Sequence, residues 1–203
     1  MQSLLATAGL LLATAITPGP NNLVVLREAG RSGVRGAVAA IGGIMLGGIA
    51  LLTLTIAGAG PLLVGHAVPR TALSAGGAVY MAWLGACLLG GFRNGAGSAL
   101  DGTPLPAGML GLFGFQFLNP KGWAMVLTIV ATSATAGLSG YLQLVSLFTL
   151  ILLACLLLWA VSGCLLGGLL TRPSSRQCID TAMGVLLLGS ALLILVELNW
   201  RTP

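Results

Sequence analysis

Two short polar segments interrupt long apolar stretches of this chain, and both contain proline. The first is Thr17-Pro18-Gly19-Pro20-Asn21-Asn22, and the second is Leu118-Asn119-Pro120-Lys121. Proline removes a backbone donor and clashes with the preceding turn, so each segment predicts a break in a helix. A helix that restarts after Pro20 presents free N–H groups and a partial positive end, which suit a carboxylate. Asn21 and Asn22 either cap that helix or contact a polar solute.

Lys121 is the only lysine of the chain and the single charged side chain between residues 102 and 171. A lysine inside a bilayer costs roughly 2.5–3.5 kcal/mol. Two interpretations stay open: the side chain extends to the cytoplasmic headgroups, or its ammonium faces a cavity and attracts an anionic group of a substrate.

The composition indicates where these segments must lie. Of 203 residues, 57% are hydrophobic and 6% are charged, whereas a soluble domain carries about 25% charged residues. So few charges cannot make a water-facing surface, so the sequence excludes a soluble enzyme and predicts an all-α integral membrane protein. The net charge of +5 does not indicate nucleic-acid binding, because the basic residues lie at the ends of apolar stretches.

About six transmembrane helices fit the charge-free stretches, since one crossing needs about 20 apolar residues. The predicted spans are residues 4–26, 36–59, 72–92, 107–135, 141–170 and 178–198. Helices one and four contain the proline breaks. Ala13-Thr14-Ala15 resembles a signal-peptide cleavage site, but no positive segment precedes it. We therefore expect residues 4–26 to be a retained first helix of a single transmembrane domain, residues 1–203.

The two halves of the chain resemble each other. When residues 12–26 are laid on residues 113–127, Pro18 falls on Pro120. With three spans in each half, the second repeat must be inserted upside down relative to the first. Inverted repeats with proline-broken helices are typical of secondary transporters, and the broken helices mark the binding site.

The predicted fold is therefore two inverted three-helix repeats. The first repeat covers about residues 1–92 and the second about residues 107–199.

The arginines predict the orientation. Odd-numbered connections between spans contain Arg27, Arg31, Arg35, Arg93, Arg172 and Arg176, and the other side contains Arg70 and Arg201. Basic residues in short loops stay on the cytoplasmic side. Both termini are therefore expected outside.

The remaining ionisable groups have simple explanations. Glu28, Asp180 and Glu197 each have an arginine three or four positions away, which indicates helical ion pairs. A role in proton coupling is the alternative for these carboxylates. His66 lies between two prolines and is interpreted as an exposed loop residue.

Cysteines and glycines indicate packing. Cys87, Cys155, Cys164 and Cys178 form no C-x-x-C pair and read as small apolar residues. Gly43-x-x-x-Gly47 and Gly163-x-x-x-Gly167 predict close helix contacts, within a subunit or in a homodimer.

Several of these motifs together resemble the lysine exporter (LysE/RhtB) family. The matching segments, in chain order, are T-P-G-P-N-N (17–22), G-I-M-L-G (43–47), G-A-V-Y-M-A-W-L-G (77–85), F-x-x-x-x-x-N-P-K (113–121) and the glycines Gly184 and Gly189. The resemblance covers nearly the whole chain.

The resemblance implies a secondary transporter of the bacterial inner membrane that exports amino acids or close derivatives, coupled to the proton motive force. It implies no enzyme activity, cofactor or metal; the expected partners are an amino acid, protons and membrane lipid. Some members carry an acidic residue directly after the second-span glycine motif. Gly48 stands there in this chain, which favours neutral or zwitterionic substrates.

The candidate substrate site combines the two breaks. Carried over from the family motifs are Pro18, Gly19, Pro20, Asn21, Asn119, Pro120 and Lys121; Thr17, Asn22 and Gln116 complete the set.

Two other functions were considered. A membrane thiol–disulfide electron carrier would need two cysteines that meet near the breaks, and none is adjacent in sequence to Pro18 or Pro120. An accessory membrane subunit would leave two costly breaks without a purpose. Neither direction of transport nor the solute follows from the residues alone.

Overall fold

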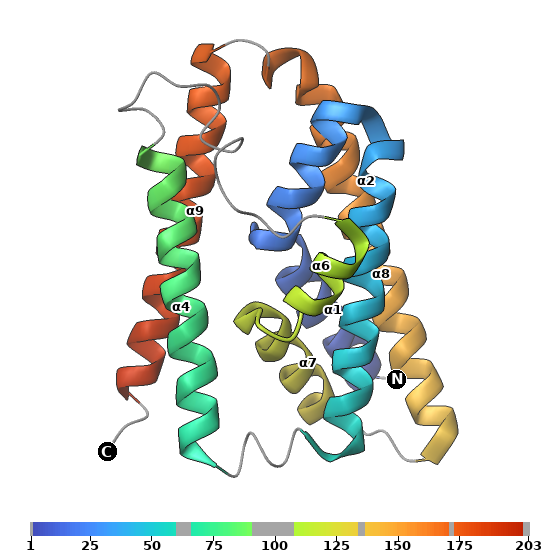
Figure 1. The fold of residues 1–203 in the computed structure, drawn as a ribbon. Coiled ribbons are helices and arrows are strands. Elements are labelled where there is room, and N and C mark those ends of the chain that lie inside the picture. Colours follow the sequence, from blue (N-terminus) through green and yellow to red (C-terminus); the bar gives the residue numbers. More distant parts are fainter. Residues whose placement is uncertain (1, 60–65, 91–107, 134–136, 171–172, 201–203) are drawn as a thin grey trace.

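The computed structural model describes residues 2–59, 66–90, 108–133, 137–170 and 173–200. Within these ranges the regular elements are all helices (Figure 1). In chain order they are α1 (Gln2–Ile16), α2 (Pro20–Leu54), the π-helical turn η1 (Thr55–Ala59), α4 (Ala67–Gly90), α6 (Gly108–Phe115), α7 (Pro120–Thr132), α8 (Gly137–Leu170) and α9 (Pro173–Trp200).

Four segments of the described chain are long and apolar enough to cross a membrane. They are Pro20–Gly58, Thr71–Gly90, Gly137–Gly168 and Gln177–Val196, and Leu4–Ile16 is a shorter apolar helix. Large apolar side chains cover the outer surface, among them Leu110, Leu165 and Leu193, which are 85%, 76% and 72% exposed. An apolar surface of this extent requires a lipid environment. The prediction of an all-helical membrane protein is confirmed.

Helix α2 reverses its direction at Gly33, whose φ of 71° is readily adopted only by glycine. Before Gly33, residues 26 and 30 of α2 approach Gly163 and Gly167 of α8, so the two helices run parallel. After Gly33, Gly48 approaches Phe148 and Thr53 bonds to Tyr141, so they run antiparallel. The sequence predicted a connection here between separate spans; the structure replaces it with two helical arms that meet at one glycine.

Helices α1 and α7 run antiparallel to each other in the middle of the bundle. Thr17 contacts Lys121 at one end of their interface, and the Thr7 and Ser133 hydroxyl oxygens lie 3.4 Å apart at the other. Helix α6 lies against the second arm of α2, where Gly43 approaches the carbonyl of Met109. The segment that follows α1 meets the segment that follows α6, where Asn21 bonds to Gln116.

Helices α4 and α9 form an antiparallel pair at one side of the bundle (Figure 1). Gly85 and Gly184 bring their backbones together, since a Cβ on either glycine would approach the other's carbonyl oxygen to about 3.0 Å. The pair joins the rest of the molecule through a small cluster that includes Leu23, Leu84 and Leu187.

Both G-x-x-x-G motifs are used within the chain. Gly43 and Gly47 of α2 contact α6, and Gly163 and Gly167 of α8 contact the first arm of α2. The sequence left open whether these motifs form contacts within a subunit or in a homodimer. The contacts seen here lie within a subunit. Three arginines used for the orientation, Arg93, Arg172 and Arg201, lie outside the described residues.

Candidate functional site

The first break comprises residues 17–19, between the end of α1 at Ile16 and the start of α2 at Pro20. The buried Asn22 donates from Nδ2 to the carbonyl oxygens of Ala15 (3.1 Å) and Thr17 (2.7 Å). Asn22 therefore satisfies the carbonyls at the end of α1. Of the two roles left open for Asn21 and Asn22, capping the start of α2 is not found, since Gly19 stands at the cap position and no side chain bonds there.

The second break comprises residues 116–119, between α6 and α7. Its backbone forms tight turns in which Gln116, Phe117 and Leu118 donate to carbonyls three residues earlier. Asn119 caps α7, because its Oδ1 accepts from the backbone N–H of Lys121 at 3.1 Å. Proline occupies the first position of the helix that follows each break, so Pro20 is the structural counterpart of Pro120, in place of the Pro18 predicted from the sequence repeat.

An indole covers one carbonyl at each break. Nε1 of Trp159 donates to the Ile16 oxygen at 3.2 Å, and Nε1 of Trp123 donates to the Phe117 oxygen at 2.9 Å. Backbone groups without an internal helical partner must find another one in an apolar interior. The two tryptophans meet this requirement on the two sides of the site.

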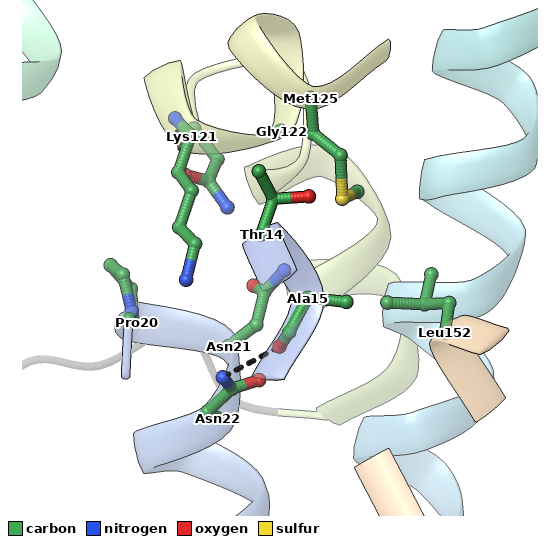
Figure 2. A pocket seen from close by; sticks show the side chains of 11 residues that line it. Thr14, Ala15, Pro20, Asn21, Asn22, Lys121, Gly122, Met125 and Leu152 are labelled. Atoms are coloured by element: carbon green, nitrogen blue, oxygen red, sulfur yellow. Dashed lines mark hydrogen bonds between the residues drawn. The ribbon is translucent and has the colours of Figure 1, made fainter. Parts of the chain in front are cut away.

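Direct hydrogen bonds join the two breaks. The side-chain amides of Asn21 and Gln116 bond reciprocally, with Nδ2 to Oε1 at 2.9 Å and Nε2 to Oδ1 at 3.0 Å. Nζ of Lys121 donates to the backbone oxygens of Thr17 and of Pro18, the latter at 3.3 Å. Figure 2 shows the Lys121 side chain extending from α7 toward the start of α2. In this structure Lys121 therefore points at the opposite break and does not run along α7 toward a headgroup.

A small cavity lies between the breaks. Its lining is Thr14, Ala15, Gly19, Pro20, Asn21, Asn22, Asn119, Lys121, Gly122, Met125 and Leu152. The volume open to the centre of a water molecule is about 30 Å³, and one water needs about 10–15 Å³ by this measure. The cavity therefore has room for about two water molecules.

Two glycines allow the second break to approach its neighbours. A Cβ on Gly77 of α4 would lie 2.0 Å from Cγ of Pro120, and a Cβ on Gly47 would lie 2.6 Å from Cγ of Gln116. A Cβ on Gly19 in the first break would lie 3.0 Å from both Cδ and Nζ of Lys121. The Gly77 and Gly47 contacts leave no room for any larger residue.

The structure brings the sequence-predicted site residues together, although their role in binding is not tested by it. Six of them line the cavity: Gly19, Pro20, Asn21, Asn22, Asn119 and Lys121. Thr17, Pro18, Gln116 and Pro120 lie directly beside it and contact the lining residues or Gly77. Sequence reasoning missed Thr14, which lies one turn before the first break, and the apolar Met125 and Leu152, which carry no recognisable signal.

The other candidate groups lie apart from this arrangement, with one exception. Cys155 of α8 is buried and follows Leu152, which lines the cavity, by about one helical turn. All four cysteines are free, so the pair that an electron carrier requires is not formed. His66 is exposed immediately before α4. In the described part of the chain, no three His, Cys, Asp or Glu residues are grouped as a metal site would require.

Comparison with known proteins gives the family. The chain is similar to the cysteine/O-acetylserine efflux proteins of Salmonella typhimurium (strain LT2) and Salmonella choleraesuis (strain SC-B67), with 34% identity over 112 residues. Each alignment covers 54% of this chain and 54% of the relative, so the chain matches about half the length of these curated relatives. No solved structure matches the chain. The family model for the LysE type translocator matches residues 12–198, which confirms the resemblance inferred from the motifs: the chain belongs to the LysE type translocator family.

Proposed function

We propose that this chain exports a small zwitterionic amino acid, or a close derivative, across the bacterial inner membrane. Family membership places it among translocators and not among enzymes. The observation that carries the proposal is the meeting of two helix breaks around a cavity, where the Lys121 ammonium bonds to backbone carbonyls of the first break and Asn21 pairs with Gln116. Polar groups inside an apolar bundle cost several kcal/mol each unless they are satisfied. Binding of a polar solute would account for these polar groups, whereas helix packing alone does not.

The proposed architecture has six crossings. Helices α6 and α7 have 8 and 13 residues, and at roughly 1.5 Å per residue neither can cross about 30 Å of hydrocarbon. We therefore treat α6 and α7 as one broken crossing, and α1 with the first arm of α2 as the other.

The six crossings fall into two inverted halves in this proposal. In Figure 1 the first half runs upward, downward and upward through α1 and the first arm of α2, the second arm, and α4. The second half runs downward, upward and downward through α6 and α7, α8, and α9. The opposite directions of the corresponding crossings support the inverted repeat.

The orientation follows from the arginines at the reversal of α2. Arg27, Arg31 and Arg35 lie near Gly33, and basic residues in short connections favour the cytoplasm. In this orientation the start of α1 and the end of α9 are directed to the periplasm.

Transport requires this state to open. A cavity for about two water molecules cannot hold an amino acid, so the two breaks must move apart for a substrate to bind. Rocking of one half against the other would break the Lys121 and Asn21–Gln116 contacts and expose the cavity to each side in turn.

The substrate class follows from the charges at the site and from the relatives. The Lys121 ammonium suits a carboxylate. Gly48 faces the ring of Phe148 and a methyl group of Leu152, with no acidic side chain to receive a cationic substrate side chain. Cysteine and O-acetylserine, named for the efflux proteins above, are both zwitterions of this kind and are the first substrates to test.

Proton coupling belongs to the proposal because of the resemblance to the family. Among the described carboxylates, Asp180 of α9 is 4% exposed and Glu28 is half-buried. Asp180 is therefore the carboxylate best shielded from solvent and the first to replace by asparagine in a coupling assay.

The decisive test is efflux of labelled cysteine or O-acetylserine from proteoliposomes that contain only this chain. We expect efflux that is driven by an imposed pH gradient and is reduced at least about tenfold by Asn21→Ala or Lys121→Ala, which remove one or more hydrogen bonds. Gln143→Ala, at an exposed position of α8, is the matched amide control and should transport normally.

Two results would contradict the proposal. If the purified chain alone moves neither compound, it is an accessory subunit or transports something else. Undiminished efflux in both the Asn21 and the Lys121 variant would remove the assigned site while leaving the transport activity in place.

A further inference from the structure

The carbonyl groups of the first break can be accounted for one by one. The oxygen of Thr14 accepts from the Thr17 hydroxyl at 2.8 Å, and that of Ala15 accepts from Asn22. The oxygen of Ile16 accepts from Trp159. All three donors belong to side chains fixed by the first break itself or by α8.

The next two carbonyls differ because their donor comes from the opposite break. Nζ of Lys121 donates to both Thr17 and Pro18. Thr17 also accepts from Asn22 at 2.7 Å, but Lys121 is the donor that the described residues provide to Pro18. An ammonium on a flexible side chain, at the edge of the cavity, therefore completes the hydrogen bonding of the first break.

This break is also short of backbone donors. Pro18 and Pro20 have no N–H group and no charged side chain lies between residues 14 and 26. Residues 17 and 18 thus present a pair of carbonyl oxygens that attracts a cation, and in the empty protein that cation is Lys121.

The Lys121 ammonium has three N–H donors and shares two of them with these oxygens, so a substrate carboxylate that pairs with it competes with the oxygens for the lysine. The half-buried Pro18 oxygen would then lose the donor that Lys121 provides, which opposes binding. The ammonium group of an amino acid can donate hydrogen bonds to these oxygens in place of Lys121.

We infer that the backbone oxygens of Thr17 and Pro18 form the binding site for the substrate's α-ammonium group, and that Lys121 occupies this site when no substrate is bound. The inference rests on the proposed function. A zwitterion exchanges partners with Lys121: the carboxylate pairs with the lysine, and the ammonium replaces the lysine on the carbonyls. A compound with one of the two charges leaves either the lysine or the carbonyls without a partner.

Three thiols of similar size separate these contributions. Cysteine carries both charged groups, cysteamine lacks the carboxylate and 3-mercaptopropionate lacks the ammonium. Their half-saturating concentrations can be measured from the rise in the thermal unfolding midpoint of the purified full-length chain under reducing conditions. For the wild-type chain we expect both analogues to bind at least about tenfold more weakly than cysteine.

Lys121 variants then test the exchange itself. Lys121→Met leaves the carbonyls without a cation. The affinity for cysteamine relative to that for cysteine should therefore rise at least about tenfold. Lys121→Arg keeps a cation at the carbonyls and should exclude cysteamine as the wild-type chain does. An unchanged ratio in Lys121→Met, or tight wild-type binding of 3-mercaptopropionate, overturns the inference.

The outcomes separate the two proposals. Cysteine efflux from proteoliposomes together with an unchanged cysteamine-to-cysteine ratio rejects the ammonium site alone. Absence of both efflux and binding of all three thiols rejects the proposed function and the inference with it. If Lys121→Met does not fold, the inference is still tested by the relative affinities of the wild-type chain for the three thiols and by the binding of cysteamine to Lys121→Arg.

Discussion

In the first break the backbone offers carbonyl oxygens, whereas in the second break the side chains offer donors. Asn22 and Trp159 satisfy the carbonyls at the end of α1, and those of Thr17 and Pro18 accept from Lys121. The second break supplies the Lys121 ammonium and the Gln116 amide, which both reach across to the first break.

This difference explains how two similar proline breaks make one asymmetric site. A zwitterion has one end that donates hydrogen bonds and one that accepts them, and two identical breaks could not serve both ends equally well. In the proposed site the first break binds the ammonium and the second binds the carboxylate.

The largest difference is expected between the aspartate substitutions of the two buried asparagines, Asn22 and Asn119. Asn22 donates two hydrogen bonds to carbonyls and is 4% exposed, so Asn22→Asp places a carboxylate against oxygens and should cost more than about 3 kcal/mol. Asn119 accepts one bond at the start of α7, where aspartate is also a good cap. Asn119→Asp should change stability by less than about 1 kcal/mol.

Thermal unfolding in detergent and the yield of monodisperse protein measure this contrast. Equal tolerance of the two substitutions would mean that the breaks do not differ in hydrogen-bonding character.

Gly77→Ala acts on the second break alone. The added Cβ would lie 2.0 Å from Pro120, and forced overpacking typically costs about 1–3 kcal/mol. We expect a lower unfolding midpoint and slower efflux, measured with the same purified protein. Gly76→Ala is the matched control, because its Cβ meets no atom within 4 Å; a comparable loss in that variant would assign the effect to the helix and not to Pro120.

The reciprocal amide pair tests whether the breaks hold each other. Asn21→Ala and Gln116→Ala should each destabilise by about 1–2 kcal/mol, and the double variant should cost less than their sum by about 1 kcal/mol. Unfolding midpoints of the four proteins give this coupling energy. Additive losses would indicate that the pair seen here does not stabilise the closed state.

The smallest effects are expected at the two indoles. Trp159→Phe and Trp123→Phe each remove one hydrogen bond to a carbonyl near a break and should each lower stability by about 1 kcal/mol. Equal shifts in the unfolding midpoint would support the similarity of the two breaks in this respect. A large loss of efflux in one variant, with an unchanged midpoint, would instead give that indole a role in transport.

Much of this arrangement could be predicted from the sequence because proline acts locally. The positions of both breaks follow from Pro18, Pro20 and Pro120, which lack an N–H group. The long charge-free stretches predicted apolar helices but not the helical segment around Arg27, Arg31 and Arg35, which was expected to be a connection. The charge of Lys121 in an apolar stretch marked it as a residue that needs a partner.

The partners themselves could not be predicted in this way. Gln116 pairs with Asn21 across 95 positions, and two amide-bearing residues do not identify each other in a single sequence. Leu152 lines the cavity only because α8 passes behind it. The roles of Asn21 and Asn22 were also beyond reach, since an asparagine after a proline can cap its own helix or satisfy the previous one, and three-dimensional proximity decides.

The reversal of α2 at Gly33 has a mechanical consequence. One arm carries Asn21 and Asn22, the other packs against α6 through Gly43 and Gly47, and a single residue joins them. Because a single residue connects the two arms, we expect a tilt of the first arm to move the second arm as well. We expect that inserting a few flexible residues at Gly33 uncouples the movements of the two breaks without altering any atom that faces the solute.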